Sequence, residues 1–123
     1  MPALPIVHIE ISAKDLAAAS TFYSELFGWQ IEVDTDADYY MFAAEGGPGG
    51  GFVHTDGVQY KAGDIIPYLE TDDIDGLLKK IEAMGGKALT KKTEIPGMGW
   101  YAFFADPTGN RLGLYTGLPS QNS

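Results

Sequence analysis

The sequence contains the same segment twice, and this repeat limits the folds that the chain can adopt. The stretch ISAKDLAAASTFYSELFGWQI at 11–31 aligns without a gap to LETDDIDGLLKKIEAMGGKAL at 69–89, an offset of 58 positions. A second pair, YYMFAAEGGPGGGFVHT at 39–55 and WYAFFADPTGNRLGLYT at 100–116, aligns at an offset of 61. A repeat of this length indicates that each half forms the same supersecondary unit.

The elements of that unit follow from the local patterns. In IVHIEIS at 6–12, apolar and polar residues alternate as in a half-buried strand. A helix is predicted from a cap at Asp15 to a stop at Gly28, because apolar residues recur between them at helical spacing. Three further strands are predicted at 29–33, 39–44 and 51–55. The second half repeats the pattern, with a helix at 73–84 and strands at 65–70, 87–90, 100–105 and 111–116.

Each half is therefore a β-α-β-β-β unit, and the fold class is α+β. We expect a single domain over 5–118, with the first repeat at about 5–58 and the second at about 63–118. In each unit one sheet face packs on the helix, so the face that carries His8 and Glu10 must cover something else. Two such sheets side by side curve into an open eight-stranded barrel with a cleft, and a concave pocket of this kind is the usual place for a small ligand.

Composition excludes several classes of function. The chain has 8 Lys and Arg against 17 Asp and Glu, a net charge of −9, whereas a nucleic-acid-binding protein needs a basic face. No apolar run approaches the roughly 20 residues of a membrane span, so no membrane partner is expected. Cysteine is absent, which removes disulfides and thiolate chemistry. Without a visible signal peptide, a cytoplasmic location is the expectation.

Two segments resemble a known superfamily. VHIEISAKDLAAASTFYSELFGW and DPTGNRLGLYTG are similar to the sequence marks of the vicinal oxygen chelate superfamily, which includes glyoxalases, bleomycin-resistance proteins and extradiol dioxygenases. The resemblance covers about residues 5–118. The particular residues in these motifs are similar to those of a bacterial glyoxalase-like subgroup. It implies the paired-unit fold, a small-molecule ligand in the cleft and a homodimer.

The resemblance also locates the metal positions of the family. In metal-dependent members, one side chain on each of four cleft-facing strands binds a divalent ion that acts on the substrate. The first position here is His8, and its repeat partner is Ile66. The carboxylate position, seven residues after Asp106, is Gly113, and its repeat partner at the offset of 61 is Phe52. Of these four only His8 can donate to a metal, so no cofactor is expected.

Strand alternation predicts which other residues line the cleft. The expected set is His8, Glu10, Phe52, His54, Ile66, Tyr68, Glu70, Met98, Trp100, Gly113 and Tyr115. Within it, His8, Glu10, His54 and Glu70 are of the types that form a displaced divalent-metal site, or they hydrogen-bond one another and water. His8 and Glu10 are also candidates for metal-free proton transfer, since an imidazole titrates near pH 6.5.

Two glycine-rich segments flank the predicted strands. EGGPGGG at 45–51 lacks the lysine and hydroxyl residue of a phosphate-binding loop and is predicted to be a hairpin turn, with a mobile lid as the alternative. KKTEIPGMGWY at 91–101 is a second lid candidate, in which Met98 and Trp100 either cover an apolar ligand or pack in the core or a dimer contact.

Two functions fit these observations. The first is a glyoxalase-like protein that binds a small organic molecule without the four-ligand metal site, for example by sequestering a cationic or aromatic compound. The alternative is a metal-dependent enzyme, a lyase of the lactoylglutathione-lyase type or a dioxygenase, with a rearranged metal site. Nothing in the sequence decides whether the chain is an enzyme.

Overall fold

The structure is a computed structural model that describes residues 3–35 and 39–118. It contains two compact units, an N-terminal unit of Ile6–Pro67 and a C-terminal unit of Tyr68–Ser123 with Met1–Pro5. The N-terminal unit has the elements β1 (Ile6–Ala13), α1 (Leu16–Phe27), β2 (Gln30–Asp34), β3 (Tyr39–Ala43) and β4 (Gly49–His54). The C-terminal unit has α2 (Ile74–Ala83), β6 (Lys87–Ala88), β7 (Thr93–Ile95), β8 (Gly99–Ala105) and β9 (Arg111–Gly117), and begins within β5 (Ile65–Glu70).

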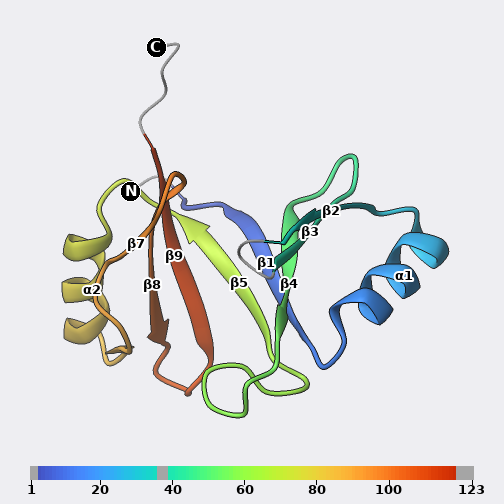
Figure 1. Cartoon of the computed structure of the whole chain (residues 1–123). Coiled ribbons are helices and arrows are strands. Elements are labelled where there is room, and N and C mark those ends of the chain that lie inside the picture. Colours follow the sequence, from blue (N-terminus) through green and yellow to red (C-terminus); the bar gives the residue numbers. More distant parts are fainter. Residues whose placement is uncertain (1–2, 36–38, 119–123) are drawn as a thin grey trace. The chain divides into compact units, whose positions relative to one another are not determined.

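The two units share one strand topology, which confirms the predicted β-α-β-β-β repeat (Figure 1). In the N-terminal unit the strand order is β2-β3-β4-β1, with β1 parallel to β4. In the C-terminal unit the order is β6-β8-β9-β5, with β5 parallel to β9. All other pairs within each unit are antiparallel. The chain is thus an α+β protein made of two copies of one unit.

Both helices begin and end where the sequence predicts. The Asp15 carboxylate accepts a hydrogen bond from the Ala18 amide at 2.9 Å, and Gly28 ends α1 with a φ of 74°. This left-handed conformation favours glycine because a Cβ would be strained there. Asp73 caps α2 in the same way, accepting from the Gly76 amide at 3.0 Å. None of the helices in the described residues is long and apolar enough to cross a membrane.

Each helix covers one face of the strands in its own unit. Under α1 the core is largely aromatic: the Trp29 ring lies 4.5 Å from Phe42 and 4.8 Å from Tyr23, and Phe52 is fully buried. Under α2 the core is mainly aliphatic and consists of Ile74, Leu78, Ala102, Phe104 and Leu114. Burial of such side chains stabilises each unit by about 1.5–3 kcal/mol per residue.

The glycine-rich segments differ in part from prediction. EGGPGGG does connect two antiparallel strands, but its last three glycines lie inside β4 rather than in the turn. The segment at 91–101 is not only a loop, because Thr93–Ile95 pairs with β8 as a short extra strand, β7. Met98 is exposed in the turn between β7 and β8. The aperiodic, Pro-containing sequence of this segment gave no strand signal.

The glycine run in β4 permits close approach of its neighbours. A Cβ on Gly50 would lie 1.9 Å from the Ile9 carbonyl oxygen and 2.4 Å from the Phe42 ring. Real Cβ atoms do not come this close to backbone, so β1 and β4 could not keep their spacing with a larger residue at position 50. Gly50 is therefore required by contact rather than by backbone conformation.

We expect Gly50→Ala to destabilise the protein by about 3 kcal/mol or more, because the clash is with backbone that cannot rotate away. Urea denaturation followed by circular dichroism measures this change. The matched control is Gly47→Ala, whose Cβ would have no heavy atom within 4 Å. It should change stability by no more than about 0.5 kcal/mol. Equal stabilities of the two variants would show that β4 does not approach β1 as described.

Candidate functional site

In each unit the strand face turned away from the helix carries the candidate functional residues; we call it the helix-distal face. In the N-terminal unit it is identified by register, since Glu10 is level with Gly51 and Gly51 is paired with Met41. The residues between them, such as Ile9, Phe42 and Phe52, belong to the core under α1. The helix-distal face of this unit therefore includes His8, Glu10, Ser12, Tyr39, Met41, Gly49, Gly51 and Val53.

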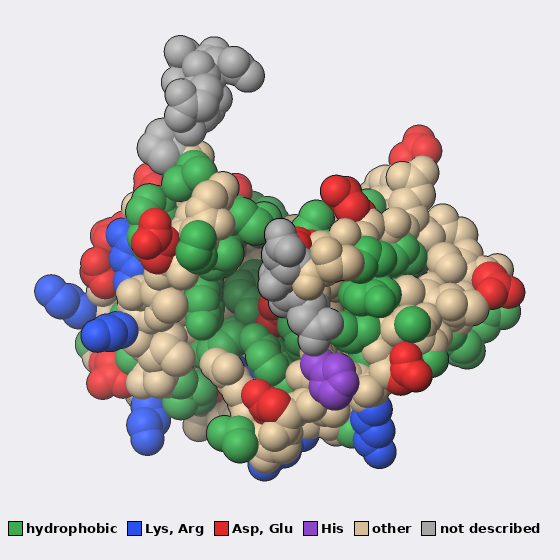
Figure 2. Space-filling view, in the orientation of Figure 1, with side chains coloured by type: hydrophobic (Ala, Val, Ile, Leu, Met, Phe, Trp, Pro, Cys, Tyr) green, Lys and Arg blue, Asp and Glu red, His purple; other side chains and the backbone are tan. Residues whose placement is uncertain are grey.

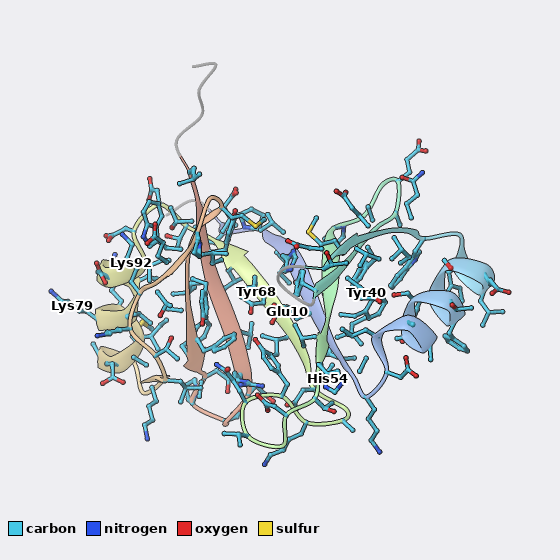
Figure 3. All side chains as sticks on the ribbon, viewed as in Figure 1. Glu10, Tyr40, His54, Tyr68, Lys79 and Lys92 are labelled. Carbon is cyan, nitrogen blue, oxygen red and sulfur yellow. The ribbon has the colours of Figure 1, made fainter. Side chains whose placement is uncertain are left out.

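A buried carboxylate lies at the centre of this face. Glu10 is only 9% exposed. Each of its carboxylate oxygens accepts a hydrogen bond from a tyrosine hydroxyl. Tyr39 donates to Oε2 at 3.3 Å, and Tyr60, from the loop after β4, donates to Oε1 at 3.2 Å. Figure 3 shows Glu10 on β1 and Tyr40, the neighbour of Tyr39, on β3. Burial of a carboxylate is costly without such donors, so these two bonds hold Glu10 in place.

Tyr39 joins this carboxylate to His8. Its hydroxyl lies 2.7 Å from His8 Nε2, and the two rings are nearly parallel, with an interplanar angle of 13°. Because the Tyr39 proton is donated to Glu10, the phenol oxygen accepts from His8 Nε2–H. The three groups form a continuous chain, imidazole to phenol to carboxylate, through which a proton can be held or moved.

The surroundings of His8 and Tyr39 keep both of these side chains neutral beside the Glu10 carboxylate. Burial lowers the pKa of His8 below its usual value of 6.5, so the imidazole is neutral near pH 7. Burial, followed by the charge of Glu10 and the hydrogen bond to it, strongly raises the pKa of Tyr39. The phenol therefore stays protonated and remains a donor to Glu10.

The Tyr39 ring also fills a space that a side chain on β4 would need. A Cβ on Gly51 would lie 2.0 Å from Tyr39 Cζ and 2.1 Å from its hydroxyl oxygen. Glycine at position 51 is thus what lets Tyr39 lie across the strand and reach Glu10. Neither Tyr39 nor Tyr60 was predicted from the sequence as a site residue. The available signal for Tyr39 was the run of three glycines in a strand, which indicates that another group lies close to the backbone.

The C-terminal unit repeats the glycine and tyrosine pairing with different residues. Gly113 is level with Tyr68, and a Cβ on Gly113 would lie 2.4 Å from two Tyr68 ring carbons. The Phe103 ring lies 5.9 Å from Tyr68 and 5.3 Å from Tyr101, so this helix-distal face is mainly aromatic. The Arg111 guanidinium lies over Phe103 at 5.1 Å.

Several predicted site residues lie on these faces. His8 and Glu10 come together in the N-terminal unit, and Tyr68, Gly113 and Tyr115 share the helix-distal face of the C-terminal unit. The Tyr115 hydroxyl donates to the Met98 carbonyl at 2.9 Å, which places Met98 at the end of that face. Glu70 is level with Tyr115 and exposed, and Ile66, two residues before Tyr68, is buried.

Three predicted site residues face the helices instead. Phe52 belongs to the core under α1, and His54 is level with Ala13 of the same core. Both residues therefore lie on the face of β4 that is turned toward α1, opposite to the predicted face. Trp100 packs against the core under α2. The error for Phe52 and His54 comes from the repeat alignment. Gly51 is level with Glu10, and Gly113 is level with Tyr68, the counterpart of Glu10, so Gly51 corresponds to Gly113 at an offset of 62 rather than 61. A one-residue slip moves every side chain to the other face.

The family comparison agrees with this architecture. The model of the Glyoxalase/Bleomycin resistance protein/Dioxygenase superfamily matches residues 5–114. The chain belongs to this superfamily. A glyoxalase/bleomycin resistance protein/dioxygenase superfamily member from Vibrio splendidus has the same fold, with a TM-score of 0.67 at 13% identity over 93% of this chain and 99% of that one.

Relatives within the glyoxalase superfamily have diverse names. The anthracycline biosynthesis protein DnrV of Streptomyces peucetius is 29% identical over 86% of this chain, but this chain covers only 44% of DnrV. The chain thus spans less than half the length of that curated relative. A methylmalonyl-CoA epimerase from Mycobacterium tuberculosis has a TM-score of 0.71 at 16% identity over 93% of this chain and 88% of that one, which shows a shared fold.

The metal positions of the glyoxalase superfamily do not fit a divalent ion in this chain. With the register corrected, they are His8, Gly51, Ile66 and Gly113, and only His8 has a donor atom. The space beside each glycine is taken by a tyrosine ring. The alternative set fits no better, because His54 faces away from His8. Within residues 6–35 and 39–67, no three His, Cys, Asp or Glu side chains are grouped as a metal site requires.

We expect Tyr39→Phe to lower the free energy of unfolding by about 1–3 kcal/mol, because buried Glu10 loses a donor while the ring shape is kept. The matched control is the next residue, Tyr40→Phe. The Tyr40 hydroxyl makes no hydrogen bond within the described residues, so its loss should cost no more than about 0.5 kcal/mol. Urea denaturation at pH 7 compares the two. If Tyr40→Phe costs as much as Tyr39→Phe, the hydroxyl is not holding Glu10.

The lowered pKa of His8 predicts a pH dependence of stability. The folded state binds a proton at His8 less readily than the unfolded chain, whose imidazole has a pKa near 6.5. The free energy of unfolding should therefore fall as the pH drops from about 6.5 toward the folded pKa of His8. His8→Gln should lose this part of the slope. NMR titration of the His8 ring, with His54→Gln used for assignment, should give a midpoint below 6.5; a midpoint above it contradicts the prediction.

Proposed function

We propose that this chain binds a small, flat organic molecule on its helix-distal faces, without the four-ligand metal site of its superfamily. The observation that carries the proposal is the replacement of two metal positions by glycines, each covered by a tyrosine ring. The same substitution occurs in both units, with Tyr39 over Gly51 and Tyr68 over Gly113. Aromatic rings thus occupy the positions at which metal-dependent relatives would carry metal ligands.

Aromatic walls favour particular ligands. Rings stack on one another in offset or edge-to-face arrangements worth about 0.5–1.5 kcal/mol beyond the buried area. The net charge of −9 attracts cations, and tyrosine faces bind them by cation–π contact. A flat, cationic organic compound satisfies both conditions, and sequestering such a compound is the role that we propose.

The proposal is consistent with the names of relatives. DnrV is named for anthracycline biosynthesis, so an anthracycline belongs among the compounds to test. We propose that ligand contacts come from the predicted residues that remain on the helix-distal face of each unit. These are His8, Glu10 and Ile66 in the N-terminal unit, and Tyr68, Glu70, Met98, Gly113 and Tyr115 in the C-terminal unit. We also propose that the protein is a homodimer, as the family resemblance implies.

Ligand binding is tested by thermal shift with four probes: 9-aminoacridine, anthracene-2-carboxylate, tetramethylammonium and an anthracycline. We expect the flat cation 9-aminoacridine to stabilise the protein most, since a ligand at 100 times its Kd adds about 2.7 kcal/mol. The shift should be unchanged by EDTA. Stabilisation by no probe, or a stoichiometric divalent ion whose binding requires His8, contradicts the proposal.

Two neighbours on β8 provide matched variants for this test. Tyr101 lies on the helix-distal face and Trp100 on the opposite face, and both are half-buried. We expect Tyr101→Leu to weaken binding of 9-aminoacridine about tenfold, and Trp100→Leu to leave the affinity within a factor of two once folding is confirmed by circular dichroism. Equal losses in the two variants would show that the helix-distal face does not hold the ligand.

A further inference from the structure

The loop between β4 and β5 brings a phenol to the buried carboxylate of the N-terminal unit. Residues 56–59 and 61–63 of this loop are exposed, and Val58 is 86% exposed, so these residues are not packed in the core. Tyr60 is half-buried instead, and its hydroxyl donates to Glu10 Oε1 at 3.2 Å. We call residues 56–60 the loop tip. Through Tyr60, a solvent-exposed segment thus contacts a buried charge.

The loop tip keeps its shape through its own hydrogen bonds. Asp56 Oδ1 accepts from the amides of Val58, Gln59 and Tyr60 at 2.9, 2.8 and 2.9 Å. The Tyr60 carbonyl accepts from the amides of Asp56 and Gly57 at 3.0 and 3.1 Å. Because these five bonds join residues within the tip, the tip can move as one body without breaking any of them.

The segments on either side of the loop tip are attached to β1. The Thr55 amide donates to the Ala13 carbonyl at 3.0 Å, and the Ser12 amide donates to the Asp64 carbonyl at 3.1 Å. Ser12 Oγ also lies 2.7 Å from the Lys61 and Asp64 carbonyl oxygens. A self-contained tip between two attached ends has the arrangement of a small lid with its hinges.

The two phenols on Glu10 differ in how easily they can leave it. Tyr39 belongs to a strand, its ring lies against Gly51, and its hydroxyl also lies 2.7 Å from His8 Nε2. Tyr60 belongs to the exposed loop, a type of segment that opens more readily than a strand. Both bonds to Glu10, at 3.3 and 3.2 Å, are longer than the roughly 2.7–2.8 Å of an ordinary O–H···O bond. Oε1 is therefore the oxygen at which a stronger donor can replace a phenol.

A cationic N–H group is a stronger donor of this kind. Hydrogen bonds from an ionised donor to a carboxylate are roughly twice as strong as those between neutral groups. A buried carboxylate that loses a donor is destabilised, so an N–H group that arrives with a ligand offsets the departure of the phenol. A quaternary cation has no proton to donate and cannot make this exchange.

The distribution of charge favours a cation at Glu10. The sequence of the N-terminal unit, 6–67, has 10 Asp and Glu against 2 Lys, whereas the rest of the chain has 7 Asp and Glu against 6 Lys and Arg. Of the net charge of −9, −8 therefore belongs to the unit that contains Glu10. Figure 2 shows Lys and Arg side chains gathered over α2, in the other unit. A field of one sign raises the local concentration of ions of the opposite sign.

We propose that an N–H⁺ group of the ligand displaces the Tyr60 hydroxyl from Glu10 Oε1, and that the loop tip moves away as one body. Tyr39 stays on Oε2 and continues to hold the carboxylate. Glu10 then selects the ligand: the class that it accepts is flat compounds with a protonated amine or ring N–H, rather than flat cations in general. This proposal rests on the small-molecule binding proposed above and names the atom that recognises the ligand's charge.

Isothermal titration calorimetry at pH 7 with two flat cations tests the selection. 9-Aminoacridine is a cation with N–H donors, and 10-methylacridinium has the same three rings and the same charge but no N–H. We expect 9-aminoacridine to bind at least about tenfold more tightly than 10-methylacridinium. Glu10→Gln should reduce this preference to about twofold or less, because the variant keeps the shape of the side chain and removes its charge.

Tyr60→Phe tests the exchange itself, since it keeps the ring and Glu10 but removes the competing hydroxyl. We expect it to tighten binding of 9-aminoacridine about fivefold and to leave the Kd of 10-methylacridinium within a factor of two. A hydroxyl with a merely structural role would weaken both when removed. The matched control, Tyr40→Phe, should leave both Kd values within a factor of two. Circular dichroism confirms that each variant is folded.

The absence of cysteine from the chain allows movement of the loop tip to be observed directly. Val58→Cys carries a trifluoroethyl label on the tip, and Glu45→Cys carries one between β3 and β4 as the control. We expect saturating 9-aminoacridine to shift the fluorine NMR signal at position 58 and not at position 45. Saturating 10-methylacridinium should shift neither signal.

The outcomes separate this proposal from the one on which it rests. Equal binding of the two cations, with Kd values that neither Glu10→Gln nor Tyr60→Phe changes, overturns the exchange at Glu10 and keeps small-molecule binding. Weaker binding of 9-aminoacridine by Tyr60→Phe, or an unshifted label at position 58, also overturns the exchange. Failure of both cations to bind overturns both proposals.

Discussion

The close approach of β4 to its neighbours is the constraint on which the N-terminal unit depends. Three successive glycines leave no side chains between β4, the β1 backbone and the rings of β3. Gly50 allows the parallel pairing with β1, and Gly51 allows Tyr39 to lie across the strand. Any larger residue would move a backbone or a buried ring. The same stretch therefore determines both the strand spacing and the position of the phenol that reaches Glu10.

The buried carboxylate follows from this arrangement. Glu10 points from β1 onto a face where Tyr39 and Tyr60 can each donate a hydroxyl, so the charge is held by neutral donors. His8 contacts the far side of the Tyr39 hydroxyl and stays neutral because it is buried. Hydrogen bonds thus join the imidazole, the two phenols and the carboxylate into one group.

Much of this could be predicted from the sequence, and the limits have a physical cause. The repeat, the caps at Asp15 and Asp73 and the alternation in β1 determine the elements and place His8 and Glu10 on one face. The register of β4 could not be found in the same way, because a strand that begins with three glycines has little alternation to read. Phe52 was therefore assigned to the wrong face. Tyr60 lies in a loop, where no periodicity relates it to Glu10.

The two repeats show how one scaffold can carry different surfaces. Glu10 and Tyr68 occupy equivalent positions in the two repeats. Glu10 accepts a hydrogen bond from a tyrosine hydroxyl, whereas the Tyr68 ring itself covers a glycine, Gly113. The helices differ in the same manner, with an apolar outer face on α1 and a charged one on α2. Packing under each helix preserves the unit, since the core positions stay apolar in both. The residues that face away from the core are free of that requirement, and it is there that the two halves differ.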